Sequence, residues 1–169
     1  MNLSAESKPR KNPAPRAVMG RVKFSYPRIR CILVPLDFSG KSRQALRYAT
    51  PLAQKFSAKI VLLHVLLPAR GAKREAPGFV PVTQPVAKSA HHRLEEMAHT
   101  LVPPAQRGAN YVRIGVPADE ILATARKLDV DIIVLTTHGR SGLKRFFVGS
   151  TAEQVMRQAG CPVLSVRRQ

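Results

Sequence analysis

One stretch of sequence, DIIVLTTHGRSGLKRFFVGST at residues 131–151, joins a short apolar run to the start of a helix through a glycine-rich loop. Residues 131–135 are almost continuously apolar, which predicts a strand buried on both faces of a parallel sheet. Residues 137–149 are expected to form a loop, and a helix is expected over 150–159. In open α/β sheets, ligands bind in the crevice beyond the carboxyl ends of the strands, where this loop would lie.

Strands and helices alternate on both sides of this stretch. Apolar runs over residues 29–36 and 59–66 predict two more buried strands, the alternating residues 110–114 predict a further strand, and residues 162–166 are expected to form the last one. The other helices are expected over residues 45–56, over 86–102 and from Pro117, where proline and two acids make a typical helix opening. This order predicts an α/β fold: a single doubly wound five-stranded parallel sheet with helices on both faces and right-handed crossovers.

Length and charge divide the chain into an arm and one domain. Residues 1–28 contain four prolines among scattered charges, with no hydrophobic period, which predicts a disordered basic arm before a domain at 29–169. The whole chain has a net charge of +18, and residues 1–30 hold eight Lys or Arg against one Glu. This balance favours anionic partners such as nucleotides, nucleic acid or acidic proteins, and a solvated basic surface is the alternative.

Cysteine usage and hydropathy predict a cytoplasmic protein with no membrane partner. Cys31 and Cys161 lie far apart and form no paired motif, which is typical of a reducing compartment. No apolar run approaches the roughly 18 residues that a membrane-spanning helix needs. The charged N-terminus is not followed by the apolar stretch of a signal peptide.

The glycine-rich loop has the composition of an anion site. Gly139 and Gly142 allow close backbone approach, and Gly149-Ser150-Thr151 places N–H groups and hydroxyls at a helix N-terminus. An alternative is structural, because Ser150 and Glu153 also match a capping box. Neither GxxxxGK[ST] nor a GxGxxG after the first strand is present, so the residues alone leave both interpretations open.

Three separated motifs resemble the universal stress protein family: VPLDFS at 34–39, LLHV at 62–65, and the loop at 136–151. The resemblance covers about residues 29–168 and implies an adenine nucleotide α-hydrolase-like fold. The ATP-binding branch of the family has a loop of the form Gly-x2-Gly-x9-Gly-Ser/Thr. Gly139 and Gly149-Ser150 match this pattern, whereas Thr136 stands where the branch has its first glycine.

This resemblance implies an adenine nucleotide site for ATP, with Mg²⁺ accompanying the nucleotide. The residues assigned to it are Pro35, Asp37, Val65, Leu135, Gly139, Gly149, Ser150 and Thr151. Asp37 would contact the adenosine part in a pocket that Pro35 helps to line. Val65 would meet the base through its backbone, Leu135 would flank the base, and the loop glycines and hydroxyls would take the phosphates. From the residues alone, Asp37 could instead cap the following helix.

The function that the resemblance implies is stress response or regulation by a homodimer that binds ATP or a related adenine nucleotide. The dimer would form through the last strand, residues 162–166. The alternatives are a nucleotide-independent interaction module and a slow ATP hydrolase. No catalytic triad, general base, lysine clamp or set of metal ligands is evident, and His64 is expected to be a hydrogen-bonded structural histidine. The basic arm could bind nucleic acid or an acidic partner.

Overall fold

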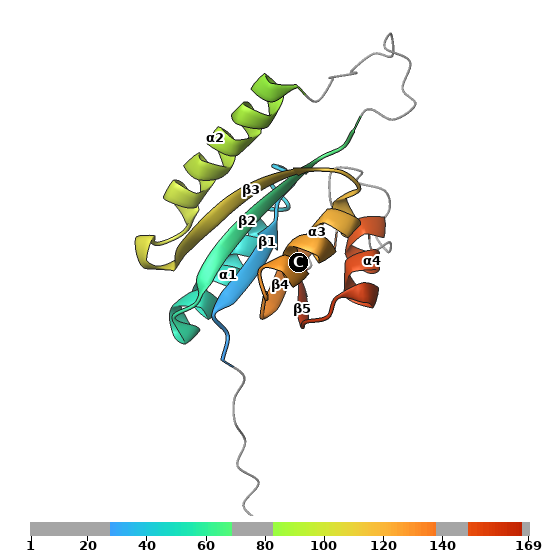
Figure 1. The fold of residues 1–169 in the computed structure, drawn as a ribbon. Helices are drawn as coiled ribbons and strands as arrows, with labels where there is room; N and C mark the ends of the chain where they lie inside the picture. The colour runs from blue at the N-terminus through green and yellow to red at the C-terminus, as the bar shows by residue number, and fades with distance from the viewer. Residues whose placement is uncertain (1–27, 69–82, 138–148, 167–169) are drawn as a thin grey trace, which may run out of the picture.

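A five-stranded parallel sheet lies between two pairs of helices in the computed structural model, which describes residues 28–68, 83–137 and 149–166 (Figure 1). The strands are β1 Cys31–Pro35, β2 Lys59–Leu66, β3 Arg107–Ile114, β4 Ile132–Thr136 and β5 Val163–Val166. The helices are α1 Gln44–Phe56, α2 Gln84–Leu101, α3 Pro117–Lys127 and α4 Ser150–Gln158, with a short 3₁₀ turn at Pro104–Gln106. The predicted arm falls outside the described residues except for Arg28.

The strand order β3-β2-β1-β4-β5 confirms the predicted doubly wound sheet. β1 lies at the centre, where Ile32 is in register with Ile60 of β2 on one side and with Ile132 of β4 on the other. The chain builds outward from β1 in one direction and then returns to build β4 and β5 in the other. The switch point between β1 and β4 is therefore the place where a doubly wound sheet opens a ligand crevice.

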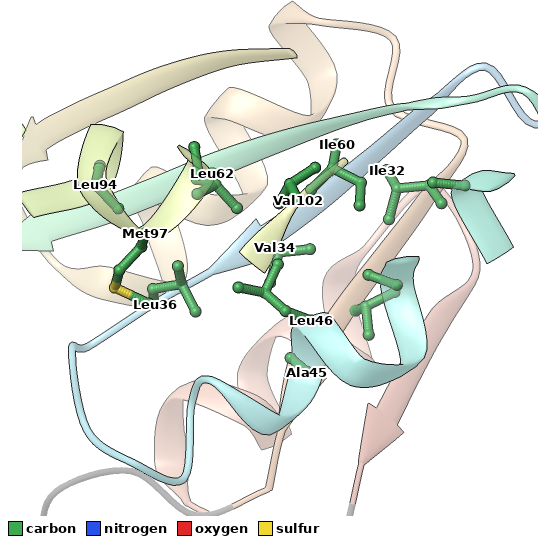
Figure 2. Packing of buried hydrophobic residues seen from close by; sticks show 14 of the residues in the cluster. Ile32, Val34, Leu36, Ala45, Leu46, Ile60, Leu62, Leu94, Met97 and Val102 are labelled. Atoms are coloured by element: carbon green, nitrogen blue, oxygen red, sulfur yellow. The ribbon is translucent and has the colours of Figure 1, made fainter. Parts of the chain in front are cut away.

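Two apolar cores follow from the side-chain alternation along the strands: the first lies between the sheet and α1 and α2, and the second between the sheet and α3 and α4. Ile32, Val34 and Ile60 point to the face that α1 and α2 cover (Figure 2). Leu33 and Ile133 point to the opposite face, which α3 and α4 cover. Each of these five side chains is almost fully buried, and burial stabilises the fold by about 1.5–3 kcal/mol for each such residue.

β3 is longer than the sequence indicated, because it begins at Arg107 rather than at Asn110. Its pairing with β2 is irregular between Ile60 and Leu62, and Gly108 lies at this irregularity. A Cβ atom on Gly108 would come within 2.7 Å of the Ile60 carbonyl oxygen, so glycine permits the close approach of the two backbones. An irregular edge strand of this kind lacks the continuous apolar run that marks β1, β2 and β4.

Other element ends differ from the prediction by one or two residues, as hydrogen bonding rather than composition decides where a strand ends. Within the described residues, no helix is both long enough and apolar enough to cross a membrane.

Candidate functional site

A pocket of about 620 Å³ opens at the carboxyl ends of β1, β2 and β4, beside the start of α4. Residues from five separate segments of the chain line it. Those that the sequence analysis had singled out are Pro35, Asp37, Val65, Leu135, Gly149, Ser150 and Thr151. Gly139, the remaining candidate, lies outside the described residues. The fold thus brings seven of the eight candidates to one pocket at the switch point of the sheet.

Asp37 closes a turn at the pocket and does not cap α1, so the capping alternative is wrong. Its Oδ1 atom accepts a hydrogen bond of 2.9 Å from the backbone N–H of Ser39, which is an Asx turn. Ser39 in turn accepts 3.1 Å bonds from the N–H and the hydroxyl of Ser42. α1 starts only at Gln44, after Arg43 in the N-cap position. The turn holds the carboxylate at the end of β1.

Phe38, next to Asp37, adopts a left-handed backbone conformation with φ of 62°. Its ring lies 4.0 Å from the ring of His64, centroid to centroid, and the Arg93 guanidinium carbon lies 4.5 Å from the Phe38 centroid. A left-handed conformation at a bulky residue costs of order 1–3 kcal/mol and persists only where its surroundings enforce it. The contacts with His64 and Arg93 supply that enforcement and so fix the backbone that presents Asp37.

His64 links this stack to the pocket, which it also lines. Its Nδ1 atom lies 2.7 Å from the carbonyl oxygen of Leu36, and because a carbonyl only accepts, Nδ1 donates the proton. The expectation of a hydrogen-bonded histidine is confirmed. Phe38 and Arg93 were not among the predicted site residues, because their contact joins residues 55 positions apart, one on the turn after β1 and one on α2.

α4 begins at the pocket with Gly149 as its N-cap residue. The Gly149 N–H donates a 2.7 Å bond to the carbonyl of Thr137, and a Cβ on Gly149 would lie 3.2 Å from that oxygen. The capping-box alternative is wrong, because the N-cap residue is Gly149, which makes no side-chain hydrogen bond, and Ser150 already belongs to the helix. Glu153 instead forms an ion pair with Arg157 one turn later. The first N–H groups of α4 and its positive dipole end therefore lie at the pocket.

The pocket walls are mainly apolar. Leu63 and Leu66 of β2 line it together with Pro117 and Ile121 of α3. Pro117 and Ile121 were not among the candidates, since only the crossover from β3 brings α3 over this part of the sheet. Thr136, at the end of β4, is half-buried and also lines the pocket. Apolar walls together with a carboxylate and a helix N-terminus suit a ligand with an apolar body and an anionic group.

The two cysteines both lie at the amino-terminal ends of strands, away from the pocket. Cys31 begins β1, and Cys161 precedes β5. Burial raises the pKa of both thiols above its ordinary value, and the Asp131 carboxylate raises it further. That carboxylate accepts hydrogen bonds of 2.7 and 2.9 Å from the backbone N–H groups of Arg30 and Cys31.

No group of three or more His, Cys, Asp or Glu that could hold a metal ion occurs among residues 28–68, 83–137 and 149–166.

Comparison with known proteins agrees with this architecture. Residues 28–167 match the universal stress protein family. A universal stress protein of Methanocaldococcus jannaschii is 30% identical over 144 residues, covering 81% of each chain. A universal stress protein structure from Lactobacillus plantarum superposes with a TM-score of 0.64, at 27% identity over 84% of this chain and all of the other.

A more distant structure shows the same fold with a bound nucleotide. The universal stress protein from Archaeoglobus fulgidus, solved in complex with dAMP, has a TM-score of 0.61 at 19% identity, over 83% of this chain and all of the other. The family match spans nearly all of the chain after the arm, and the fold and the motifs agree with it. The chain belongs to the universal stress protein family.

Proposed function

We propose that this protein binds an adenine nucleotide, ATP with Mg²⁺, in the pocket, and that it acts in the cytoplasm as a homodimer in stress response or regulation. The observation that supports the proposal best is the convergence of the candidate residues. Segments after β1, on β2, on β4 and at the start of α4 all contribute to one pocket at the switch point of the sheet. The Archaeoglobus fulgidus protein of the same fold binds dAMP, and we extend that class of ligand to this chain.

The pocket residues fit the two ends of a nucleotide. Val65 and Leu135 offer an apolar wall for the flat base, and the Asp37 carboxylate can accept hydrogen bonds from ribose hydroxyls. The phosphates would lie at the N-terminus of α4, where the backbone N–H groups and the hydroxyls of Ser150 and Thr151 are donors. Mg²⁺ would accompany the phosphates and offset part of their charge. The residues here bind and orient the nucleotide.

Gly149 makes room for the phosphates under this proposal. A side chain on Gly149 would start 3.2 Å from the Thr137 carbonyl oxygen, at the first N–H groups of α4. We expect Gly149→Val to weaken ATP binding at least 10-fold, because two added methyl groups would occupy the space in front of those N–H groups. Isothermal titration calorimetry with ATP and Mg²⁺ measures this directly.

Gly160 provides the matched control for this substitution. A Cβ on Gly160 would meet nothing within 4 Å, and it follows α4 at the end away from the pocket. Gly160→Val should therefore bind ATP as the wild type does. If wild-type protein gives neither heat nor a thermal shift at millimolar ATP, the proposed function is wrong. If Gly149→Val and Gly160→Val bind ATP equally well, Gly149 does not make room for the phosphates.

A further inference from the structure

The outward side of α1 is strongly basic. Lys41, Arg43, Arg47 and Lys55 are all exposed on this helix or directly before it. Residues 38–74 contain eight Lys or Arg and no Asp or Glu. None of these four cations lines the nucleotide pocket or takes part in a salt bridge among the described residues. We call the four side chains, together with Tyr48 between them, the α1 basic face.

Three of the four cations of the α1 basic face, all except Lys55 in the last turn, oppose the stability of the helix that bears them. α1 has no acidic residue in its first turn, and Lys41 and Arg43 lie at its positive dipole end. Arg43 and Arg47 are four positions apart, a spacing at which like charges repel. Both placements cost folding free energy, and no acidic side chain of α1 offsets them.

Two other helices of the described structure, α3 and α4, follow the usual electrostatic rules. α3 has Asp119 and Glu120 in its first turn and Arg126 and Lys127 in its last, as its dipole favours. α4 has Glu153 in its first turn and Arg157 in its last, and the two form an ion pair. α2 has no acid in its first turn but contains Glu95 and Glu96. α1 is the one α-helix of the described residues with no acidic side chain, and an arrangement that costs stability in one element is a sign of function.

The aromatic and guanidinium groups of the α1 basic face indicate what it binds. Tyr48 is 51% exposed and directly follows Arg47. Exposed aromatic rings within basic surfaces stack on unpaired bases, and guanidinium groups form paired hydrogen bonds to phosphate. The helical rise places Arg43 and Lys55 roughly 18 Å apart, enough to follow several successive phosphates of a strand.

A lipid surface fits this helix less well. Basic amphipathic helices bind membranes by inserting their apolar side. The apolar side of α1, formed by Ala45, Leu46, Ala49 and Ala53, is buried against the sheet and already part of the first core. We propose that the α1 basic face binds single-stranded nucleic acid, with its cations on the phosphate backbone and Tyr48 stacked on a base.

Two double variants of the full chain test this proposal at equal net charge. Arg43→Gln with Arg47→Gln removes two cations from the α1 basic face, whereas Arg126→Gln with Lys127→Gln removes two exposed cations from α3. Fluorescence anisotropy with a labelled 30-nucleotide DNA strand of mixed sequence gives the affinity between 50 and 200 mM salt. The basic arm is present in both variants, so its contribution is constant.

We expect the α1 variant to bind at least about 10-fold more weakly at low salt, and the α3 variant to stay within about 2-fold of wild type. The dependence of log K on log salt should become shallower by about 1.4 in the α1 variant, since two phosphate contacts are lost at about 0.7 each. Tyr48→Ala should lose about fivefold or more, and Tyr48→Phe should retain wild-type affinity because the ring still stacks. Melting temperatures of all variants confirm that they fold.

Three results would overturn the proposal. Equal losses in the two double variants would assign binding to net charge alone. Wild-type affinity in the α1 variant would place any binding elsewhere on the chain. Co-sedimentation with phosphatidylserine vesicles that exceeds binding to the DNA strand, and that Arg43→Gln with Arg47→Gln abolishes, would make the face a lipid surface.

Discussion

The residue that best shows how local strain serves the pocket is Phe38. It holds a left-handed backbone conformation between His64 and Arg93, next to the Asx turn of Asp37. The stack contributes through ring contacts of about 0.5–1.5 kcal/mol each, and the backbone conformation costs a similar amount. Phe38 is thus an anchor whose side chain stabilises a turn that its own backbone disfavours.

Truncation of Phe38 separates these two effects. Phe38→Ala removes the stack but keeps a Cβ atom in the left-handed region, so we expect a loss of about 1–3 kcal/mol in the free energy of unfolding. Phe38→Gly removes the stack and also the strain, because glycine adopts positive φ at no steric cost. The glycine variant should therefore be at least as stable as the alanine variant in urea unfolding. A glycine variant clearly less stable than the alanine variant would show that position 38 is not strained.

At the scale of the elements, β5 forms one edge of the sheet beside β4, and this edge bears on whether the protein dimerises. An uncovered edge strand presents unpaired backbone groups that invite pairing with another chain. Val163 of this strand is half-buried and packs on the second core. We expect dimerisation through β5, and Val163→Lys should shift the protein toward a monomer because it places a charge at the paired edge.

The opposite edge supplies the control for the dimer. Val112 of β3 is also half-buried, but packs on the first core at the other end of the strand order. Val112→Lys should leave a dimer in multi-angle light scattering at tens of micromolar protein, provided that it still folds. A wild-type mass of one chain would contradict the dimer. So would a Val163→Lys variant that remains dimeric.

Comparison of the elements with the sequence shows where prediction succeeds. The buried strands β1, β2 and β4 were predictable because both of their faces are apolar, and this leaves continuous runs of Ile, Leu and Val. β3 was cut short in the prediction because its exposed edge and Gly108 interrupt that pattern. The start of α4 at Ser150 was predicted correctly, but the capping-box alternative for Ser150 was wrong, because Gly149 is the N-cap residue and its backbone N–H bonds to Thr137.

Some pocket residues can be predicted from local sequence motifs, whereas others depend on contacts between distant parts of the chain. Asp37 and Gly149 stand in recognisable local motifs, and both line the pocket. Arg93 and Ile121 take their places only through the packing of α2 and α3 on the sheet, which no local pattern encodes. The folded topology is thus needed to complete the site.

At the scale of the whole molecule, charge is distributed unevenly. Acidic and basic residues balance on α3 and α4, whereas α1 and the N-terminal arm are basic. The arm should contribute nothing to folding, since its prolines and charges leave it few apolar side chains to bury. Deletion of the arm, residues 1–28, should change the melting temperature by less than about 2 °C, below the roughly 2–4 °C that 1 kcal/mol produces in a domain of this size. Calorimetric melting of the full and truncated chains measures it. A much larger decrease would show that the arm packs on the domain.

A crystal structure of the protein soaked with ATP and Mg²⁺ tests the central claim most directly. The account predicts density for the adenine base between Val65 and Leu135, for the ribose beside Asp37, and for the phosphates at the N-terminus of α4 near Gly149 and Thr151. Nucleotide bound at any other place, or an empty pocket in crystals soaked with millimolar ATP, would contradict it.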